Sequence, residues 1–189
     1  MTASEGQALL LLARAAIVDR LLGGGALQAA RRGVAVTPAL EERRGVFVTL
    51  KVPEAGGGLR LRGCIGSIVG EEPIRDGVVA AARAAAFSDP RFPPLTPQEL
   101  DDVVLSVSAL TVPSPAGSAH AIVAGVHGVV LEAGSHRAVF LPQVAAEQGW
   151  DTPTLLAELA RKAGLLPDGW REGRLFTFRS ENFGETPDP

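Results

Sequence analysis

The sequence runs Val46-Phe47-Val48-Thr49-Leu50-Lys51-Val52, crosses residues 53–58, and continues Leu59-Arg60-Leu61-Arg62-Gly63-Cys64-Ile65-Gly66. The first stretch is β-branched and apolar, which is typical of a mostly buried strand. The residues between the two stretches, Pro53 to Gly58, are turn formers. We therefore predict two neighbouring strands, and the fold of the rest of the chain has to be built around them.

The second stretch carries the only cysteine of the chain. Side chains alternate between the two faces of a strand. The alternation predicts two sets of side chains on opposite faces: Leu59, Leu61 and Ile65 on one, and Arg60, Arg62 and Cys64 on the other. Neighbouring cations favour thiolate over thiol, so this arrangement would make Cys64 reactive near neutral pH. A bulge at Gly63 would instead move Cys64 away from the arginines.

Three interpretations of this stretch remain open. Cys64 is a nucleophile, or the arginines and the backbone N–H groups around Gly63 and Gly66 hold an anion. Alternatively, Cys64 is a small core residue and the glycines only accommodate a bulge.

A cysteine nucleophile usually needs a general base. Of the three histidines, His127 is the best candidate because it lies in the turn Gly125–Gly128 before a predicted hairpin. A turn residue that tolerates left-handed backbone angles is the more ordinary role for it. One cysteine and no histidine pair at metal spacing predict neither a metal site nor a cofactor.

Three further polar residues are candidate ligand contacts. Asp89 and Arg91 lie in the proline-stiffened loop Asp89-Pro90-Arg91-Phe92, where functional groups are often presented. An internal salt bridge or an Asx-turn is the alternative for this pair. Gln143 and Trp150 could line a pocket, although tryptophan is more often a core residue.

The remaining elements set the fold class. The spacing of Ser4 and Gln7 predicts a capped amphipathic helix that Gly23 ends, and Pro73 begins a second helix. Further predicted elements are a helical turn with a Thr96–Glu99 capping box, a strand over 103–110, a hairpin of 128–132 with 137–141, a helix from Thr152 to Gly164, and a strand over 175–178 that precedes a polar tail. Helices that alternate with hairpin-linked strands favour an α+β fold with a mostly antiparallel sheet over a doubly wound one.

Composition narrows the function classes. A chain of 189 residues fits one domain, and its net charge of −3 with no basic run longer than two residues argues against nucleic acid as a partner. The leucine run Leu9–Leu12 follows Glu5 and is interrupted by Arg14 and Asp19, so it predicts neither a signal peptide nor a membrane span. A single cysteine suits a reducing compartment, and we expect a cytoplasmic protein.

Four short motifs resemble the AMMECR domain family in order and spacing, from about Leu9 to Glu185. They are Leu-Arg-Gly-Cys-Ile-Gly at 61–66, Asp-Pro-Arg-Phe at 89–92, Leu-Pro-Gln-Val at 141–144 and Lys-Ala-Gly-Leu at 162–165. The resemblance implies a single α+β domain over residues 1–189, with a core of about 9–185 and a polar tail at 184–189. It also implies a larger and a smaller lobe, with the Arg-Gly-Cys-Ile-Gly segment in the larger lobe near a cleft.

The resemblance implies no particular reaction. It does imply partners, a Memo-like protein and a radical S-adenosylmethionine enzyme, because the prokaryotic genes of the family often lie beside genes for these two. We expect a binding or accessory module that recognises an anionic small molecule, a peptide or a partner protein. The alternative is an enzyme with Cys64 as nucleophile and His127 as base. The predicted ligand contacts are Arg60, Arg62, Gly63, Gly66, Asp89, Arg91 and Gln143.

Overall fold

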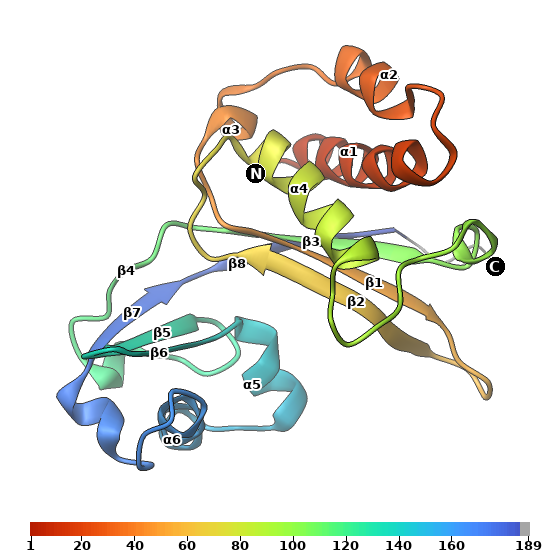
Figure 1. Ribbon diagram of the computed structural model, residues 1–189. Helices are drawn as coiled ribbons and strands as arrows, with labels where there is room; N and C mark the ends of the chain where they lie inside the picture. The colour runs from red at the N-terminus through yellow and green to blue at the C-terminus, as the bar shows by residue number, and fades with distance from the viewer. Residues whose placement is uncertain (186–189) are drawn as a thin grey trace. The chain divides into compact units, whose positions relative to one another are not determined.

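The structure, a computed structural model, describes residues 1–185 as two compact units (Figure 1). Of the described residues, 1–109 and 181–185 form unit 1, and Leu110–Ser180 form unit 2. Each unit contains helices and a largely antiparallel sheet, which confirms the predicted α+β class. That the two units are the lobes of one domain stays a prediction.

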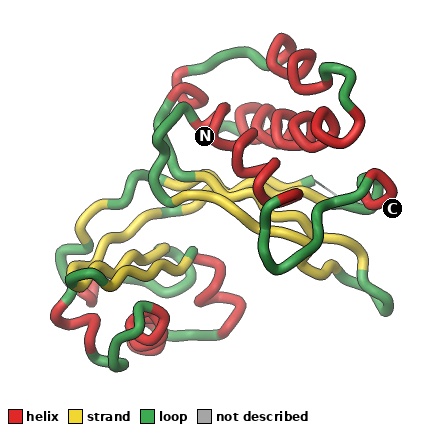
Figure 2. Tube along the Cα trace, in the orientation of Figure 1, coloured by secondary structure: helices red, strands yellow, loops and turns green. Residues whose placement is uncertain are grey.

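The sheet of unit 1 has four strands in the order β2-β1-β3-β8 (Figure 2). Their bounds are β1 Val46–Pro53, β2 Leu59–Ser67, β3 Val104–Leu110 and β8 Ser180–Gly184. β1 pairs antiparallel with β2, as the turn formers between these two strands predict, and on its other side it pairs antiparallel with β3. Alternate residues of β1 are buried, so only one of its faces looks into the main core.

The helices of unit 1 are α1 Ala3–Leu22, α2 Ala26–Gly33, α3 Pro38–Glu41 and α4 Ile74–Phe87, with a 3-10 turn η1 at Pro97–Glu99. α4 lies on β1 and β2, and α1 packs against α4 (Figure 1). The predicted cap of the first helix is wrong by two residues, because Thr2 and Glu5, not Ser4 and Gln7, form the capping box. The Thr96–Glu99 box is confirmed.

β8 is one of the elements that the sequence pattern does not predict, and α2 and α3 are the others in unit 1. Its Phe183 ring covers Gly6 of α1, where a Cβ atom would lie 2.0 Å from the Phe183 Cδ1 atom. Glu185, the first residue after β8, accepts a hydrogen bond from the Leu105 N–H at 2.8 Å and forms an ion pair with Arg14. The first two residues of the predicted tail, 184 and 185, are thus part of unit 1, and residues 186–189 lie outside the described residues.

Unit 2 contains a sheet in the order β4-β7-β5-β6. Its elements are β4 Ser114–Pro115, η2 Ala119–Ala121, β5 Gly128–Ala133, β6 His136–Phe140, α5 Pro142–Gln148, α6 Thr152–Lys162, η3 Gly169–Glu172 and β7 Arg174–Phe178. The predicted hairpin is confirmed as β5 and β6, and α6 begins where predicted, with the Asp151 side chain as its cap. The sequence pattern does not predict β4, η2, α5 or η3. No helix among residues 1–185 combines the length and apolar character needed to cross a membrane.

Candidate functional site

A β-bulge interrupts β2 at Arg62. Leu50 of β1 stands opposite Gly63 and Lys51 stands opposite Leu61, so Arg62 has no partner residue on β1. The predicted alternation is therefore wrong from this point on. Cys64 stands opposite Thr49, and Thr49 shares a strand face with Lys51, which places Leu61 rather than the arginines on the cysteine's face.

The Arg62 side chain points into unit 1 and is only 4% exposed. Its Nε donates to Glu99 Oε1 at 2.7 Å and its Nη2 donates to Glu99 Oε2 at 3.1 Å, a bidentate pair. Glu99 also accepts hydrogen bonds from the backbone and hydroxyl of Thr96. The Arg62 guanidinium, followed by these Thr96 donors, lowers the pKa of Glu99 to about 2. The charge of Arg62 is thus neutralised inside the fold.

Asp89 and Arg91 together hold the outer edge of β2, and we call this pair the edge clasp. Asp89 Oδ2 accepts the Cys64 N–H at 2.9 Å, and Arg91 Nη2 donates to the Cys64 carbonyl at 3.2 Å. The two side chains are joined by Arg91 Nε to Asp89 Oδ1 at 2.9 Å and Nη2 to Oδ2 at 2.7 Å. The internal salt bridge predicted as an alternative is present, and it binds to the cysteine's own backbone.

The carboxylate of the edge clasp is buried, with Asp89 only 4% exposed. The Arg91 guanidinium holds the pKa of Asp89 far below its usual range, although burial alone would raise it. The same hydrogen bonds raise the pKa of Arg91. The pair therefore stays ionised at any ordinary pH.

The Cys64 side chain is half-buried, and the Thr49 hydroxyl donates to its sulfur at 3.2 Å. The sequence gives no warning of this contact, because it depends on which residue of β1 stands opposite Cys64. The histidines all belong to unit 2. His127 lies in its predicted turn, where its Nδ1 accepts the Val123 N–H at 3.0 Å. Its φ is not positive, so it does not adopt the left-handed angles of the ordinary role, and its role as a base stays a prediction.

Gln143 and Trp150 belong to unit 2. Gln143 is the second residue of α5, and its Oε1 is buried without a hydrogen-bond partner among the described residues. Trp150 packs edge-to-face against Phe140, with ring centroids 5.4 Å apart, in the apolar core of unit 2. The core role predicted as the alternative for Trp150 is confirmed, and ligand contact by Gln143 stays a prediction.

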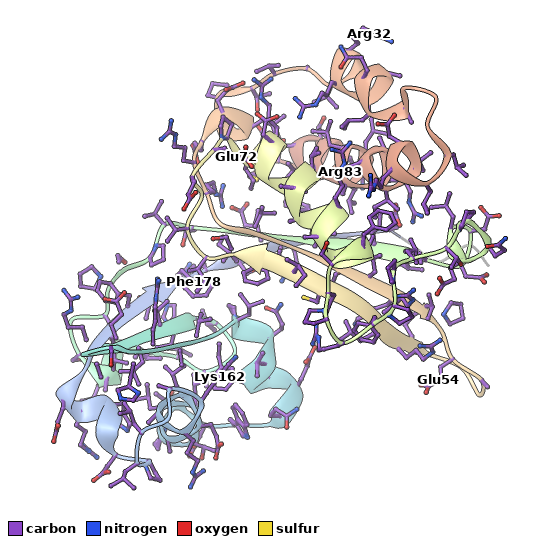
Figure 3. The ribbon with its side chains drawn as sticks, viewed as in Figure 1. Arg32, Glu54, Glu72, Arg83, Lys162 and Phe178 are labelled. Carbon is purple, nitrogen blue, oxygen red and sulfur yellow. The ribbon has the colours of Figure 1, made fainter. Side chains whose placement is uncertain are left out.

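A pocket of about 380 Å³ opens beside the second half of β2. Its lining comes from three places in unit 1: the start of β1 with the end of β2, the loop at 69–72, and one side of α4. The lining residues are Arg44, Val46, Ile65, Gly66, Ser67, Val69, Gly70, Glu71, Glu72, Gly77, Ala80, Ala81 and Ala84. Figure 3 marks Glu72 just before α4 begins. Sequence reasoning finds Gly66 alone of these residues.

Glycines let the backbones around the pocket approach each other closely. A Cβ atom on Gly66 would lie 2.1 Å from the Val46 carbonyl oxygen, and one on Gly63 would lie 2.2 Å from the Ala85 carbonyl oxygen. Real Cβ atoms do not approach backbone oxygens this closely, so any other residue would push β2 away from β1 or α4. The two glycines therefore act through packing, and they fix the position of β2 at the pocket.

Arg44 is the one cation of the pocket lining, and it is already paired. Its Nη2 lies 2.6 Å from Glu181 Oε1 and its Nη1 lies 3.8 Å from Glu42 Oε2, and the residue is 8% exposed. Burial would raise the pKa of Glu181, but Arg44 and the N-terminal ammonium of Met1, which both pair with this carboxylate, together lower it. The exposed Glu71 and Glu72 carboxylates are the other charges of the lining. No group of metal-ligating side chains occurs within residues 1–185.

Comparison with known proteins agrees with the four sequence motifs. The AMMECR1 family model matches residues 10–183. A protein of Methanothermobacter thermautotrophicus is 42% identical over 98% of this chain and 96% of its own length. One of Thermofilum pendens is 40% identical over 98% and 92%. The crystal structure of an uncharacterised protein from Pyrococcus horikoshii superposes with a TM-score of 0.78 at 35% identity, covering 96% of this chain and 92% of the other. The chain therefore belongs to the AMMECR1 family.

Proposed function

We propose that the chain is a non-catalytic binding module whose ligand occupies the pocket between the end of β2 and α4. One observation carries the proposal. The charged groups around Cys64 form ion pairs with each other, Arg62 with Glu99 and Arg91 with Asp89, whereas the pocket next to them is open. Its volume of about 380 Å³ is in the range of small-molecule and side-chain pockets.

The walls of the pocket support this role because they are rigid. The loop after β2 packs on the chain before β1 with no space for side chains, since a Cβ atom on Gly45 would lie 2.1 Å from the Ile68 carbonyl oxygen. One on Gly70 would lie 2.4 Å from the Arg44 carbonyl oxygen. A pocket held in its bound shape before the ligand arrives loses less entropy on binding. Arg62, Glu99 and the edge clasp serve as its frame.

A screen of a fragment library by protein-observed NMR tests the proposal. We expect hits to shift the backbone amides of Gly66 and Val69, and the substitution Ala80→Leu to weaken them at least tenfold, because Ala80 is exposed and lines the pocket. Ala29→Leu is the matched control, an exposed alanine of α2 outside the lining. Hits that cluster elsewhere, or that survive Ala80→Leu, would refute the proposal.

An enzyme with Cys64 as nucleophile is the second candidate. The contact that favours it is the Thr49 hydroxyl, which donates to the half-buried sulfur at 3.2 Å and would orient it. This candidate predicts that native protein is alkylated by iodoacetamide near neutral pH faster than glutathione is, and that Cys64→Ser abolishes the activity. The binding module predicts slow alkylation and fragment binding by Cys64→Ser within about twofold of the unmodified chain.

The remaining sequence predictions enter the proposal unchanged. A Memo-like protein and a radical S-adenosylmethionine enzyme are the proposed partners, and the cytoplasm is the proposed location. The anionic ligand expected from the sequence would have to bind outside the pocket, where Arg60 and Arg91 are exposed and Arg91 already pairs with Asp89. The pocket lining, by contrast, carries the exposed carboxylates of Glu71 and Glu72.

A further inference from the structure

We infer that the ligand of the pocket is an extended peptide segment with a basic side chain, which pairs with the edge of β2 at Gly66. The inference rests on the proposed function, since it names the ligand of the same pocket. Three observations support it: the direction of the backbone groups of β2, the place where the edge clasp ends, and the charges of the lining.

β2 is an edge strand, because the order of the sheet is β2-β1-β3-β8. At Cys64, which stands opposite Thr49, the N–H and C=O groups bond to the edge clasp and so point away from β1. Peptide groups two residues apart on a strand point in the same direction. The N–H and C=O groups of Gly66, opposite Phe47, therefore also point outward, and Gly66 lines the pocket.

The edge clasp determines how far a peptide can extend along β2. Asp89 and Arg91 occupy the Cys64 backbone groups from outside the sheet, as a neighbouring strand would. A peptide that adds to this edge can thus pair at Gly66 but must end or turn away before Cys64. Beyond Gly66, the chain turns at Ser67, whose hydroxyl donates to the Val69 carbonyl at 2.7 Å. The open edge is short, and it fits one or two residues of an extended segment.

The lining favours a positive ligand. Arg44 is compensated by Glu181 and Glu42, so the exposed carboxylates of Glu71 and Glu72 give the pocket its net charge. On the opposite wall α4 presents only Gly77 and three alanines, Ala80, Ala81 and Ala84. This smooth apolar wall suits the methylene chain of a lysine or arginine, while the charged end meets the two glutamates. An acidic side chain would be repelled.

Matched peptide pools test the inference. We would use acetylated and amidated hexapeptide pools in which one position is fixed as lysine, arginine, glutamate or glutamine, with amide NMR titration as the readout. We expect the lysine and arginine pools to bind and to shift the Gly66 amide. The double substitution Glu71→Gln with Glu72→Gln should weaken them about fivefold, and 0.5 M NaCl should do so by a similar factor. The control is Glu147→Gln with Glu158→Gln, two glutamates of unit 2.

Each other outcome overturns the inference. Preference for glutamate pools, or binding that ignores the Glu71 and Glu72 substitutions, would contradict the charge argument. Binding without a shift at Gly66 would contradict pairing with the β2 edge. If no pool binds, while fragments still bind in the pocket and Ala80→Leu weakens their binding, the peptide inference fails and the binding module stands. If fragments also fail, both proposals fall.

Discussion

Glycines lie both in the turn before β2 and in its second half, but for opposite reasons. In the turn with the start of β2, which we call the open end, Gly56, Gly57 and Gly58 have φ angles of 105°, 93° and 98°, and a Cβ atom on any of them would meet nothing within 4 Å. In the second half of β2, which we call the closed end, Gly63 and Gly66 have no positive φ, yet a Cβ atom would collide with backbone. The lack of a side chain lets the first three glycines adopt the positive φ angles of a turn, and it lets Gly63 and Gly66 pack directly against neighbouring backbone.

The same contrast applies to the side chains. At the open end Leu59 and Arg60 are exposed, next to the turn that carries Glu54 (Figure 3). At the closed end Arg62 is bound to Glu99, and the Cys64 backbone is bound to the edge clasp. The closed end is therefore held in place by contacts within unit 1, and the part of it that our proposals leave to a ligand is the outward backbone of Gly66, which lines the pocket. Substitutions can test this division, beginning with the largest expected effect.

Gly63→Ala should be the most damaging change in β2. Its Cβ would lie 2.2 Å from the Ala85 carbonyl oxygen, so the strand or α4 has to move, and we expect a loss of about 3 kcal/mol in the free energy of unfolding. Urea unfolding followed by far-UV circular dichroism measures it. Tryptophan fluorescence is unsuitable because Trp150 and Trp170 both lie in unit 2. Gly77→Ala, whose Cβ would lie 3.4 Å from Val46 Cγ1, is the control and should cost little. Equal stability of the two variants would contradict steric exclusion at Gly63.

Glu99→Gln should have a smaller, pH-dependent effect. The pKa of Glu99 is about 2 in the folded chain against a usual 4.5, so its ionised form stabilises the fold above about pH 4.5 and that contribution is lost as the pH falls toward 2. We expect Glu99→Gln to lower the free energy of unfolding by about 2 kcal/mol at pH 7, less than a fully buried pair because Glu99 is partly exposed.

The gap between Glu99→Gln and the unmodified chain should close as the pH falls from about 4.5 toward 2, which urea unfolding at a series of pH values measures. Glu158→Gln, which removes an ion pair with Arg161 on α6, is the control and should change stability by less than about 0.5 kcal/mol. A gap that does not depend on pH would show that the Arg62–Glu99 ion pair contributes nothing as an ion pair.

Gly57→Ala should be the mildest change. Its φ of 93° is unfavourable for alanine, but there is open space around it, so the effect is limited to backbone strain of about 1 kcal/mol. The same urea experiment measures it. A loss as large as that of Gly63→Ala would mean that the open end also carries packing, and the division of β2 into two ends would be wrong.

Local sequence signals predicted much of the fold. The strand at Val46, the turn after Pro53, the hairpin of unit 2 and the helix after Asp151 all follow from periodicity and turn chemistry, and they are present. β8 is not predicted, because Ser180–Gly184 is polar and becomes a strand only by pairing within the sheet. Its one large apolar residue, Phe183, finds its place on Gly6, far away in the sequence.

Sequence reasoning names the candidate site residues but not their contacts. The structure brings the Arg-Gly-Cys-Ile-Gly segment together with Asp89 and Arg91. The sequence allows a bulge at Gly63 as an alternative, but its place at Arg62 depends on how β2 aligns with β1, which no local pattern contains. The partnership of Arg62 with Glu99, and the pocket lining from α4, are likewise long-range contacts that no local pattern contains.

The late position of β8 also has a consequence for protein synthesis. Its strand completes the sheet of unit 1, and Glu185 ties Leu105 and Arg14 together, yet the ribosome makes these residues only after the whole of unit 2. At elongation rates of about 5–20 residues per second the edge of β3 waits roughly several seconds while unit 2 is synthesised. During that interval the unpaired edge of β3 can pair with another chain, and a chaperone that covers this edge would prevent such aggregation.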